Sequence, residues 1–196
     1  MNMPPITPES LMPLETYAKA RQDYRTRVMA HKKQRTVALG PDITLIFEDE
    51  LTIRYQVQEM LRIERIFEEA GIRDELDTYN PLVPDGNNWK VTMLIEYPDV
   101  VERTRMLQRL IGIEDRVFVQ VAGFSLVHAI ADEDLDRSTD TKTAAVHFLR
   151  FELGAEMIAA LKRGAALTLG VDHPEYRARV EAVTAPVRDA LVNDLR

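Results

Sequence analysis

Residues 41–71 constrain the fold most, because their pattern reads as a strand that leads directly into a long helix. In the first part, alternate positions are apolar, as on one face of a strand: Ile43, Leu45 and Phe47. Asp49 is then suited to cap a helix, and Gly71 is suited to end it. Between them, apolar residues recur at helical spacing: Ile53, Val57, Met60, Leu61 and Phe67. This strand and helix are the predicted scaffold of the chain.

Two carboxylates on the predicted helix are candidates for a functional site. Glu64 falls on the apolar stripe, where a carboxylate is costly to bury unless it is paired or bound to a cation. Glu59 lies on a different face of the same helix. The simpler interpretation is an ion pair with arginine, because Glu59 with Arg62, and Arg65 with Glu69, have the spacing of neighbours on a helix surface.

The chain contains no cysteine, which excludes several kinds of chemistry. Without thiols there are no thiol nucleophiles, disulfides or thiolate-bound zinc, and the usual ligands of iron–sulfur clusters are missing. We therefore expect the protein to carry no iron–sulfur cluster of its own. The net charge of −7 makes nucleic acid an unfavoured partner, although a local basic patch could still bind it.

Length and hydropathy predict one soluble domain over residues 1–196. A hydrophobic content of 45% and a charged content of 29% are ordinary for a folded protein of this size. No run approaches the roughly 18 consecutive apolar residues of a membrane helix, so we expect no membrane partner. The first ten residues lack the charged and apolar regions of a signal peptide, which predicts a cytoplasmic location.

A basic helix is predicted at 14–33, after a proline-rich arm at 1–13 that docks on the domain. Tyr17, Tyr24 and Val28 form its apolar stripe. The other faces and the residues just beyond the helix carry the positive charge: Lys19, Arg21, Arg25, Arg27, Lys32, Lys33 and Arg35. This segment is opposite in sign to the chain as a whole.

The basic segment has two interpretations. Clustered cations can bind phosphate or RNA independently of sequence, and Lys32, Lys33 and Arg35 are then the candidate anion contacts. No recognisable nucleic-acid-binding motif accompanies them. The simpler interpretation is a solvated face that pairs with acidic segments at 48–50 or 132–136.

The rest of the chain alternates between predicted strands and helices. Strands are predicted at 35–39, 90–97, 117–121, 124–130, 144–153 and 165–171. Helices are predicted after Asp99, at about 155–163 and in the carboxy-terminal segment, which Pro186 interrupts. Residues 72–89 predict a long ordered loop, because turn-forming residues cluster there. Two hairpins in this order indicate an α+β domain with a mixed or largely antiparallel sheet and helices packed on it.

A metal site would have to be assembled across the fold, since no local nucleotide, metalloprotease or serine-hydrolase motif is present. Carboxylates with one or two histidines suit a divalent metal such as iron, manganese or zinc. The candidate ligands are Glu59, Glu64, His147, Glu152 and His173. On a regular strand His147 and Glu152 face opposite sides, and Arg150 could form an ion pair with Glu152 instead.

Several phrases together resemble an uncharacterised bacterial family of unknown function, over nearly the whole chain: ALGPDITLIFE, QEMLRIERIFEEAG, YNPLVP, MLIEYPD, GIEDRVFVQV, AIADED, KTAAVHFLRFEL and LGVDHPEY. The resemblance implies genes encoded beside a rubrerythrin-like protein and an iron–sulfur oxidoreductase. A chain without cysteine would fit a role as an assistant to such cysteine-rich partners.

Three functions therefore stay open at the level of sequence. The first is an accessory or binding protein in an iron–sulfur or rubrerythrin redox or peroxide-stress system. The second is a nucleic-acid or anion-binding module that uses residues 19–35. The third is a metal-dependent enzyme acting on a small substrate. Self-association into a homo-oligomer is also open.

Overall fold

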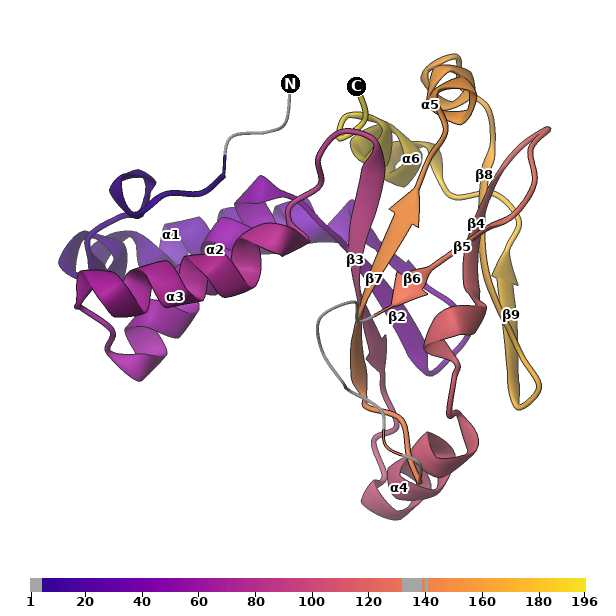
Figure 1. Ribbon diagram of the computed structural model, residues 1–196, viewed down its shortest axis with the longest axis horizontal. Coiled ribbons are helices and arrows are strands. Elements are labelled where there is room, and N and C mark those ends of the chain that lie inside the picture. Colours follow the sequence, from indigo (N-terminus) through magenta and orange to yellow (C-terminus); the bar gives the residue numbers. More distant parts are fainter. Residues whose placement is uncertain (1–4, 132–138, 140) are drawn as a thin grey trace.

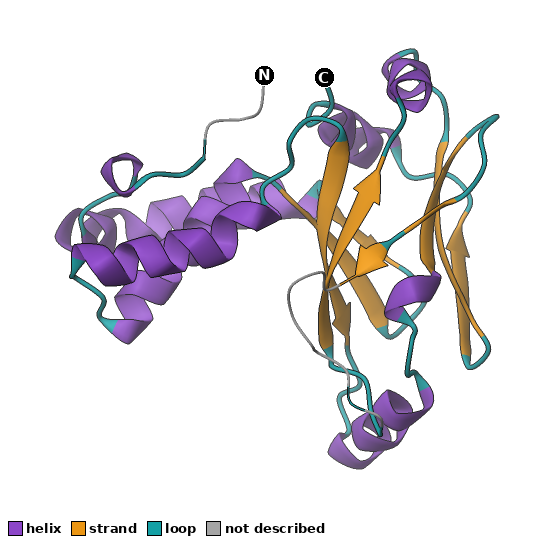
Figure 2. Ribbon diagram, in the orientation of Figure 1, coloured by secondary structure: helices purple, strands orange, loops and turns teal. Residues whose placement is uncertain are grey.

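The computed structural model describes residues 5–131, 139 and 141–196. Their strands form two antiparallel sheets, which confirms the predicted α+β class (Figures 1 and 2). The first sheet has the order β1 (Thr36–Ala38), β2 (Ile43–Glu48), β3 (Asn88–Ile95), β7 (Val146–Glu152) and β6 (Ile130–Ala131). The second has the order β5 (Val127–His128), β4 (Val117–Val121), β8 (Leu167–His173) and β9 (Tyr176–Val180).

The two sheets share one apolar core. In β3, Trp89, Val91, Met93 and Ile95 are buried, while the residues between them are more exposed. The same alternation in β7 buries His147, Leu149 and Phe151. Residues from β4 and β8 complete the core from the second sheet: Val117, Val119, Val121, Leu167, Leu169 and Val171. Burying alternate residues of both sheets fixes the register of every strand, because a one-residue slip would expose the apolar set.

Three helices form a bundle that projects from the first sheet: α1 (Leu14–Lys33), α2 (Glu50–Glu64) and α3 (Glu69–Tyr79) (Figure 1). Three shorter helices lie at the two ends of the paired sheets: α4 (Val100–Arg109), α5 (Ala155–Lys162) and α6 (Ala185–Val192). Short 3₁₀ turns complete the structure: η1 (Pro8–Ser10), η2 (Asn80–Leu82) and η3 (Glu114–Arg116). Among the described residues, no helix combines the length and apolarity needed to cross a bilayer.

The sequence prediction was wrong about the region between α2 and β3. Helix α2 ends at Glu64, whereas we predicted that it would continue to Gly71, which lies inside α3. Most of the predicted loop at 72–89 is helical or a 3₁₀ turn, and only residues 83–87 are irregular. The reason is tertiary packing: the helically spaced Ile72, Leu76 and Tyr79 pack against the apolar residues of α2.

The carboxy-terminal segment also differs from the prediction. Residues 176–180, which we expected to be helical, form strand β9 with every second side chain more exposed. Pro186 lies at the start of α6 instead of interrupting a helix, because its missing N–H costs nothing in the first turn. The acidic segment 132–136, a predicted partner of the basic helix, lies outside the described residues.

Two amide side chains attach the amino-terminal arm to the helical bundle. The amide of Gln58, which is fully buried on α2, accepts a hydrogen bond from the Met12 N–H (2.7 Å) and donates one to the Met12 carbonyl (3.3 Å). Asn80 does the same for Ile6, at 2.9 and 3.0 Å. Ile6 itself is buried against Ile53 and other core residues of the bundle. The arm therefore completes the core of the bundle.

We expect Gln58→Ala to lower the free energy of unfolding by about 1–3 kcal/mol, because it removes a buried amide and leaves the half-buried backbone groups of Met12 without their partner. Hydrogen exchange at the Met12 amide should accelerate in the same variant. Gln56→Ala is the matched control, since Gln56 is only half-buried on another face of α2. Equal exchange of the Met12 amide in both variants would contradict the assigned role of Gln58.

Candidate functional site

The turn between α2 and α3 holds its first residue in an unfavourable conformation. Arg65 has φ 56° and ψ 45°, and among the described residues it is the only one other than glycine with a positive φ. The Ile66 N–H donates to the Leu61 carbonyl (3.0 Å), and the side chains of these two residues lie in one apolar cluster. This is a Schellman helix end in which arginine occupies the position that glycine usually takes. Such strain persists where surrounding packing demands it and is often found at functional sites.

Two large apolar side chains flank this strained residue and face solvent. Ile63 is 60% exposed and Phe67 is 69% exposed. They lie at the end of the bundle farthest from the sheets (Figure 1). We call residues 63–67 the turn surface. Exposed aromatic and aliphatic side chains beside arginines are typical of surfaces that bind another protein.

A network of ionic hydrogen bonds lies behind the turn surface and is centred on Glu59. Arg21 donates to both oxygens of this carboxylate, at 2.8 Å each, and Tyr17 donates to one of them at 2.7 Å. Arg62 adds two longer contacts, at 3.3 and 3.4 Å. The bonds from Arg21 lower the pKa of Glu59 to about 2 against the opposing effect of burial, with Tyr17 and Arg62 contributing further. Burial and the bond to Glu59 raise the pKa of Tyr17. The network fixes α1 against α2.

Glu64 does not lie on a buried face, contrary to the prediction. The stripe formed by Ile53, Val57 and Leu61 is buried, but α2 ends at Glu64, beyond the region that α1 and the arm cover. Glu64 is exposed. Its charge still acts on α3: the pKa of Glu75 is raised, first by burial and then by the negative charge of Glu64.

The other predicted metal ligands lie in the two sheets and serve different contacts. His147 is fully buried and forms a hydrogen bond of 2.8 Å with Thr143, and its Nε2 lies 3.8 Å from Glu114. His173, at the end of β8, donates from Nε2 to the Ile111 carbonyl (3.1 Å). The Glu175 N–H donates to its other ring nitrogen (3.2 Å).

Glu152 forms an ion pair with Arg150, as the simpler interpretation predicted, and also accepts from Asn88 (3.2 Å). The structure thus places the candidate ligands on α2, β7 and β8 without bringing them to one point. Within residues 5–131, 139 and 141–196, no three side chains of the His, Cys, Asp or Glu types are gathered closely enough to hold a metal ion. The divalent metal therefore stays a prediction from sequence.

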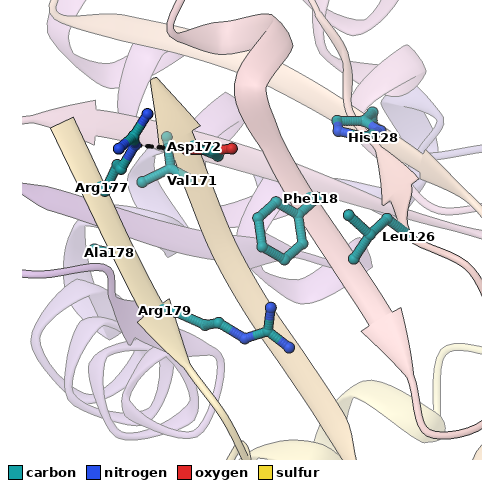
Figure 3. Close-up of a pocket in the computed structure, with 8 residues that line it drawn as sticks. All are labelled: Phe118, Leu126, His128, Val171, Asp172, Arg177, Ala178 and Arg179. Atoms are coloured by element: carbon teal, nitrogen blue, oxygen red, sulfur yellow. Dashed lines mark hydrogen bonds and ion pairs between the residues drawn. The ribbon is translucent and has the colours of Figure 1, made fainter. Parts of the chain in front are cut away.

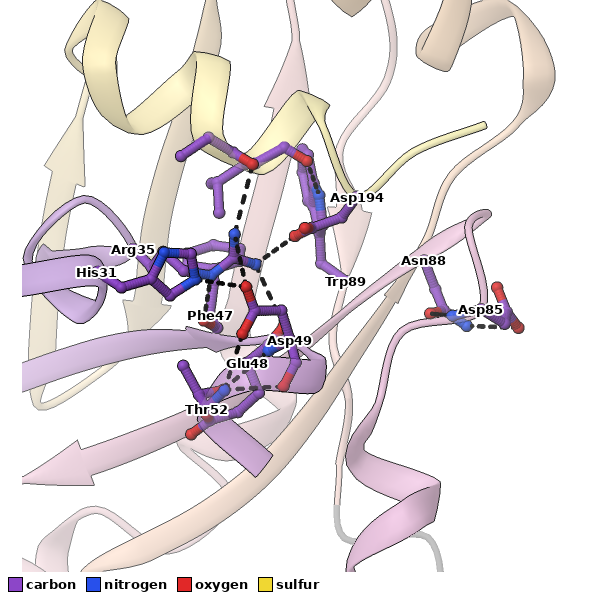
Figure 4. A network of polar contacts seen from close by, with 12 residues as sticks. His31, Arg35, Phe47, Glu48, Asp49, Thr52, Asp85, Asn88, Trp89 and Asp194 are labelled. Carbon is purple, nitrogen blue, oxygen red and sulfur yellow. Dashed lines mark hydrogen bonds and ion pairs between the residues drawn. The ribbon is translucent and has the colours of Figure 1, made fainter. Parts of the chain in front are cut away.

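Arg35, a predicted anion contact, is instead a buried structural residue (Figure 4). It is 2% exposed and donates to the Phe47 carbonyl (2.9 Å) and the Glu48 carbonyl (3.3 Å). Its guanidinium also forms an ion pair with Asp194 and lies 3.5 Å from Asp49. Because these groups surround it, Arg35 is not available to an anion from solvent. Arg35 does pair with Asp49 of the predicted acidic segment 48–50, but it does so in a buried site and not on the solvated face that the prediction described.

The two carboxylates beside Arg35 respond differently to it. Burial raises the pKa of Asp194, and the bonds from Arg35 offset this only in part. Burial also raises the pKa of Asp49, but Arg35, the Thr52 N–H and His31 together outweigh this effect and leave the pKa below its usual range. His31 lies 2.5 Å from Asp49 at the end of α1. Of the other predicted anion contacts, Lys32 is half-buried and Lys33 is exposed.

The sequence pattern contained one signal for the turn surface that our prediction missed. Phe67 was assigned to the predicted helix because it lies seven residues, about two helical turns, after Met60, and no glycine or proline lies between them. Glu68 and Glu69 are the clue, since consecutive acids favour the first turn of a new helix. Read in this way, they separate α2 from α3.

Comparison with known proteins places this geometry in a family. The family described as "Protein of unknown function (DUF3501)" matches residues 5–195. The chain belongs to this family. It is similar to a solved structure from Burkholderia pseudomallei, described as a novel protein of unknown function, with 54% identity and a TM-score of 0.93. The match covers 97% of this chain and 99% of the other. No curated protein matches the sequence.

We expect Arg65→Gly to raise the free energy of unfolding by about 1 kcal/mol, because glycine adopts a positive φ without the steric cost of a β-carbon. Urea unfolding followed by circular dichroism measures the change. Arg65→Ala is the control, since it removes the same charge but keeps the β-carbon. An equal gain in both variants would show that the charge, and not the backbone, is responsible.

We expect Glu59→Gln to lower the free energy of unfolding by about 1–2 kcal/mol at pH 7, because it weakens the ionic bonds from Arg21. The pKa of Glu59 is lowered from 4.5 to about 2, so its contribution is complete above about pH 4.5 and is lost as the pH falls toward 2. The difference between wild type and variant should shrink over that range. Glu15→Gln, which changes an exposed carboxylate on α1, is the control.

Proposed function

We propose that the protein is an accessory protein that binds a partner protein through the turn surface. The observation that carries this proposal is the exposure of Ile63 and Phe67 on either side of the strained Arg65. Exposing both side chains at a strained turn opposes stability, and a partner that covers them would recover the lost burial. The Glu59 network supports binding as well, because it holds α2 rigid and so reduces the entropy lost on association.

We further propose that the partner is an iron–sulfur oxidoreductase or a rubrerythrin-like protein of a redox or peroxide-stress system. The resemblance found in the sequence supports this choice through the neighbouring genes that it implies. The absence of cysteine supports it too, since a chain without thiolates would leave cluster chemistry to its partner. In this proposal the chain positions or stabilises the partner.

A second proposal, anion binding by α1, rests on a smaller set of side chains than the sequence suggested. Arg21 and Arg35 are engaged with Glu59 and Asp194. Lys19, Arg25 and Lys33 are exposed along the helix and could still contact phosphate groups. Steep loss of binding with rising salt would support this alternative. The third hypothesis, a metal-dependent enzyme, stays a prediction.

The main proposal is tested with the two candidate partners encoded in the same genome, each purified with its metal centres. We expect one of them to bind the full chain, and Ile63→Ser with Phe67→Ser to weaken the affinity at least tenfold, as loss of buried apolar anchors does. Size-exclusion chromatography and biolayer interferometry measure this.

Val101→Ser is the matched control, because Val101 is 78% exposed on α4, away from the turn surface. It should leave the affinity unchanged. Failure of both candidates to bind would refute the redox assignment, and binding that survives the double substitution would refute the turn surface as the contact.

A further inference from the structure

A second candidate site lies on the outer face of the second sheet, which none of the described helices covers (Figure 1). Four residues there form one row across the four strands. His128 of β5 is paired with Phe118 of β4, Phe118 with Gly170 of β8, and Gly170 with Arg179 of β9. Paired residues have side chains on the same face, so this row presents two rings, a bare backbone and a guanidinium side by side.

Gly170 makes room for the ring of Phe118. A β-carbon at Gly170 would lie 2.3, 2.8 and 2.9 Å from three ring atoms of Phe118. The ring therefore lies across the bare backbone of β8 instead of standing away from the sheet. Glycine is needed here because the ring occupies the space of a β-carbon. The backbone conformation does not require it, because Gly170 does not have a positive φ. The result is a flat aromatic floor of which only 5% is exposed, since the neighbouring side chains, Arg179 among them, lie around the ring.

The groups around this floor are cationic and aromatic. The Arg179 guanidinium carbon lies 5.8 Å from the centre of the Phe118 ring, within cation–π range. The His128 ring is 6.2 Å from the same ring and tilted by 60°. With Leu126, Arg177 and Asp172, they line a shallow depression of about 370 Å³ (Figure 3). That volume is within the range of small-molecule sites.

The arginines of this depression can exchange their present partners at little cost. Arg177 pairs with Asp172 at 2.8 Å, but both side chains are at least 70% exposed. Arg179 pairs with Glu181 at 3.0 Å and donates to Gln120 at 3.3 Å, again in solvent. Exposed ion pairs of this kind contribute little to stability, so a bound anion can replace them. The lining holds two arginines and one aspartate, and Glu181 beside it pairs with Arg179, so the depression is close to neutral although the chain carries a net charge of −7.

We propose that this depression binds a mononucleotide. The base takes the place of the Arg179 guanidinium against the Phe118 ring, and Arg179 turns with Arg177 toward the phosphate. Aromatic side chains bind bases of any type by stacking, and arginine binds phosphate through paired N–H groups. A single nucleotide is favoured over a longer strand because the net charge of the chain repels a polyanion beyond the depression. This site is independent of the proposed partner surface.

The test is titration of the full chain with adenosine 5′-monophosphate, by calorimetry and by ¹⁵N–¹H nuclear magnetic resonance. We expect binding with shifts at the amides of β4, β8 and β9. Arg179→Gln should weaken it about tenfold, as loss of a charge-assisted contact does. Arg73→Gln is the matched control, an exposed arginine paired with Glu69 on α3, and should change nothing.

Gly170→Ala provides a second variant, whose fold is checked by circular dichroism. This substitution displaces the Phe118 ring but retains both arginines. It should therefore weaken the affinity for the nucleotide and leave the affinity for inorganic phosphate unchanged. Three results would overturn the proposal: no binding of the nucleotide, equal affinity in Arg179→Gln, or inorganic phosphate binding as tightly as the nucleotide. A ten-residue uridine oligonucleotide that bound far more tightly than the mononucleotide would also overturn it, in favour of a strand-binding surface.

Discussion

The buried guanidinium of Arg35 joins the parts of this protein that pack separately. It follows the end of α1, donates to backbone carbonyls at the end of β2 and forms an ion pair with Asp194 beyond α6. Trp89 of β3 donates to the Leu191 carbonyl nearby, so the carboxy-terminal helix is also tied to the first sheet (Figure 4). A buried charge is tolerated only where it is fully paired, and here its partners come from distant parts of the chain. The bundle, the first sheet and the carboxy terminus therefore hold one another in place.

These contacts of Arg35 fix the positions of the two proposed sites relative to each other. The turn surface lies at one end of the long axis of the molecule, and the open face of the second sheet lies at the other (Figure 1). Neither surface covers the other, so a protein partner and a small ligand could be bound at the same time. Between them, the apolar core of the paired sheets resists deformation because both inner faces are closely packed.

The candidate site shows why residue chemistry alone was a poor guide. Glu59 was selected as a metal ligand, yet Arg21, Tyr17 and Arg62 occupy its oxygens. Of these, only Arg62 was predicted as a partner, since it lies on the same helix, whereas Arg21 and Tyr17 come from α1. Ile63 was not selected, because an apolar residue in a helix is ordinary until the structure shows that nothing covers it.

Local pattern in the sequence determined the α+β class, the hairpin of β1 and β2, the bounds of α1 and which residues of β7 share a face. These features depend on periodicity and capping, which act between residues close in the chain. Only the tertiary structure decided that the strands divide into two sheets, that residues 72–79 are helical and that Arg35 is buried. Each of these depends on contacts between residues far apart in sequence, such as Arg35 with Asp194, whose spacing no local pattern encodes. The physical reason is that burial is a property of the assembled core. Burial decides whether a charged side chain binds a ligand, forms an ion pair or stays in solvent.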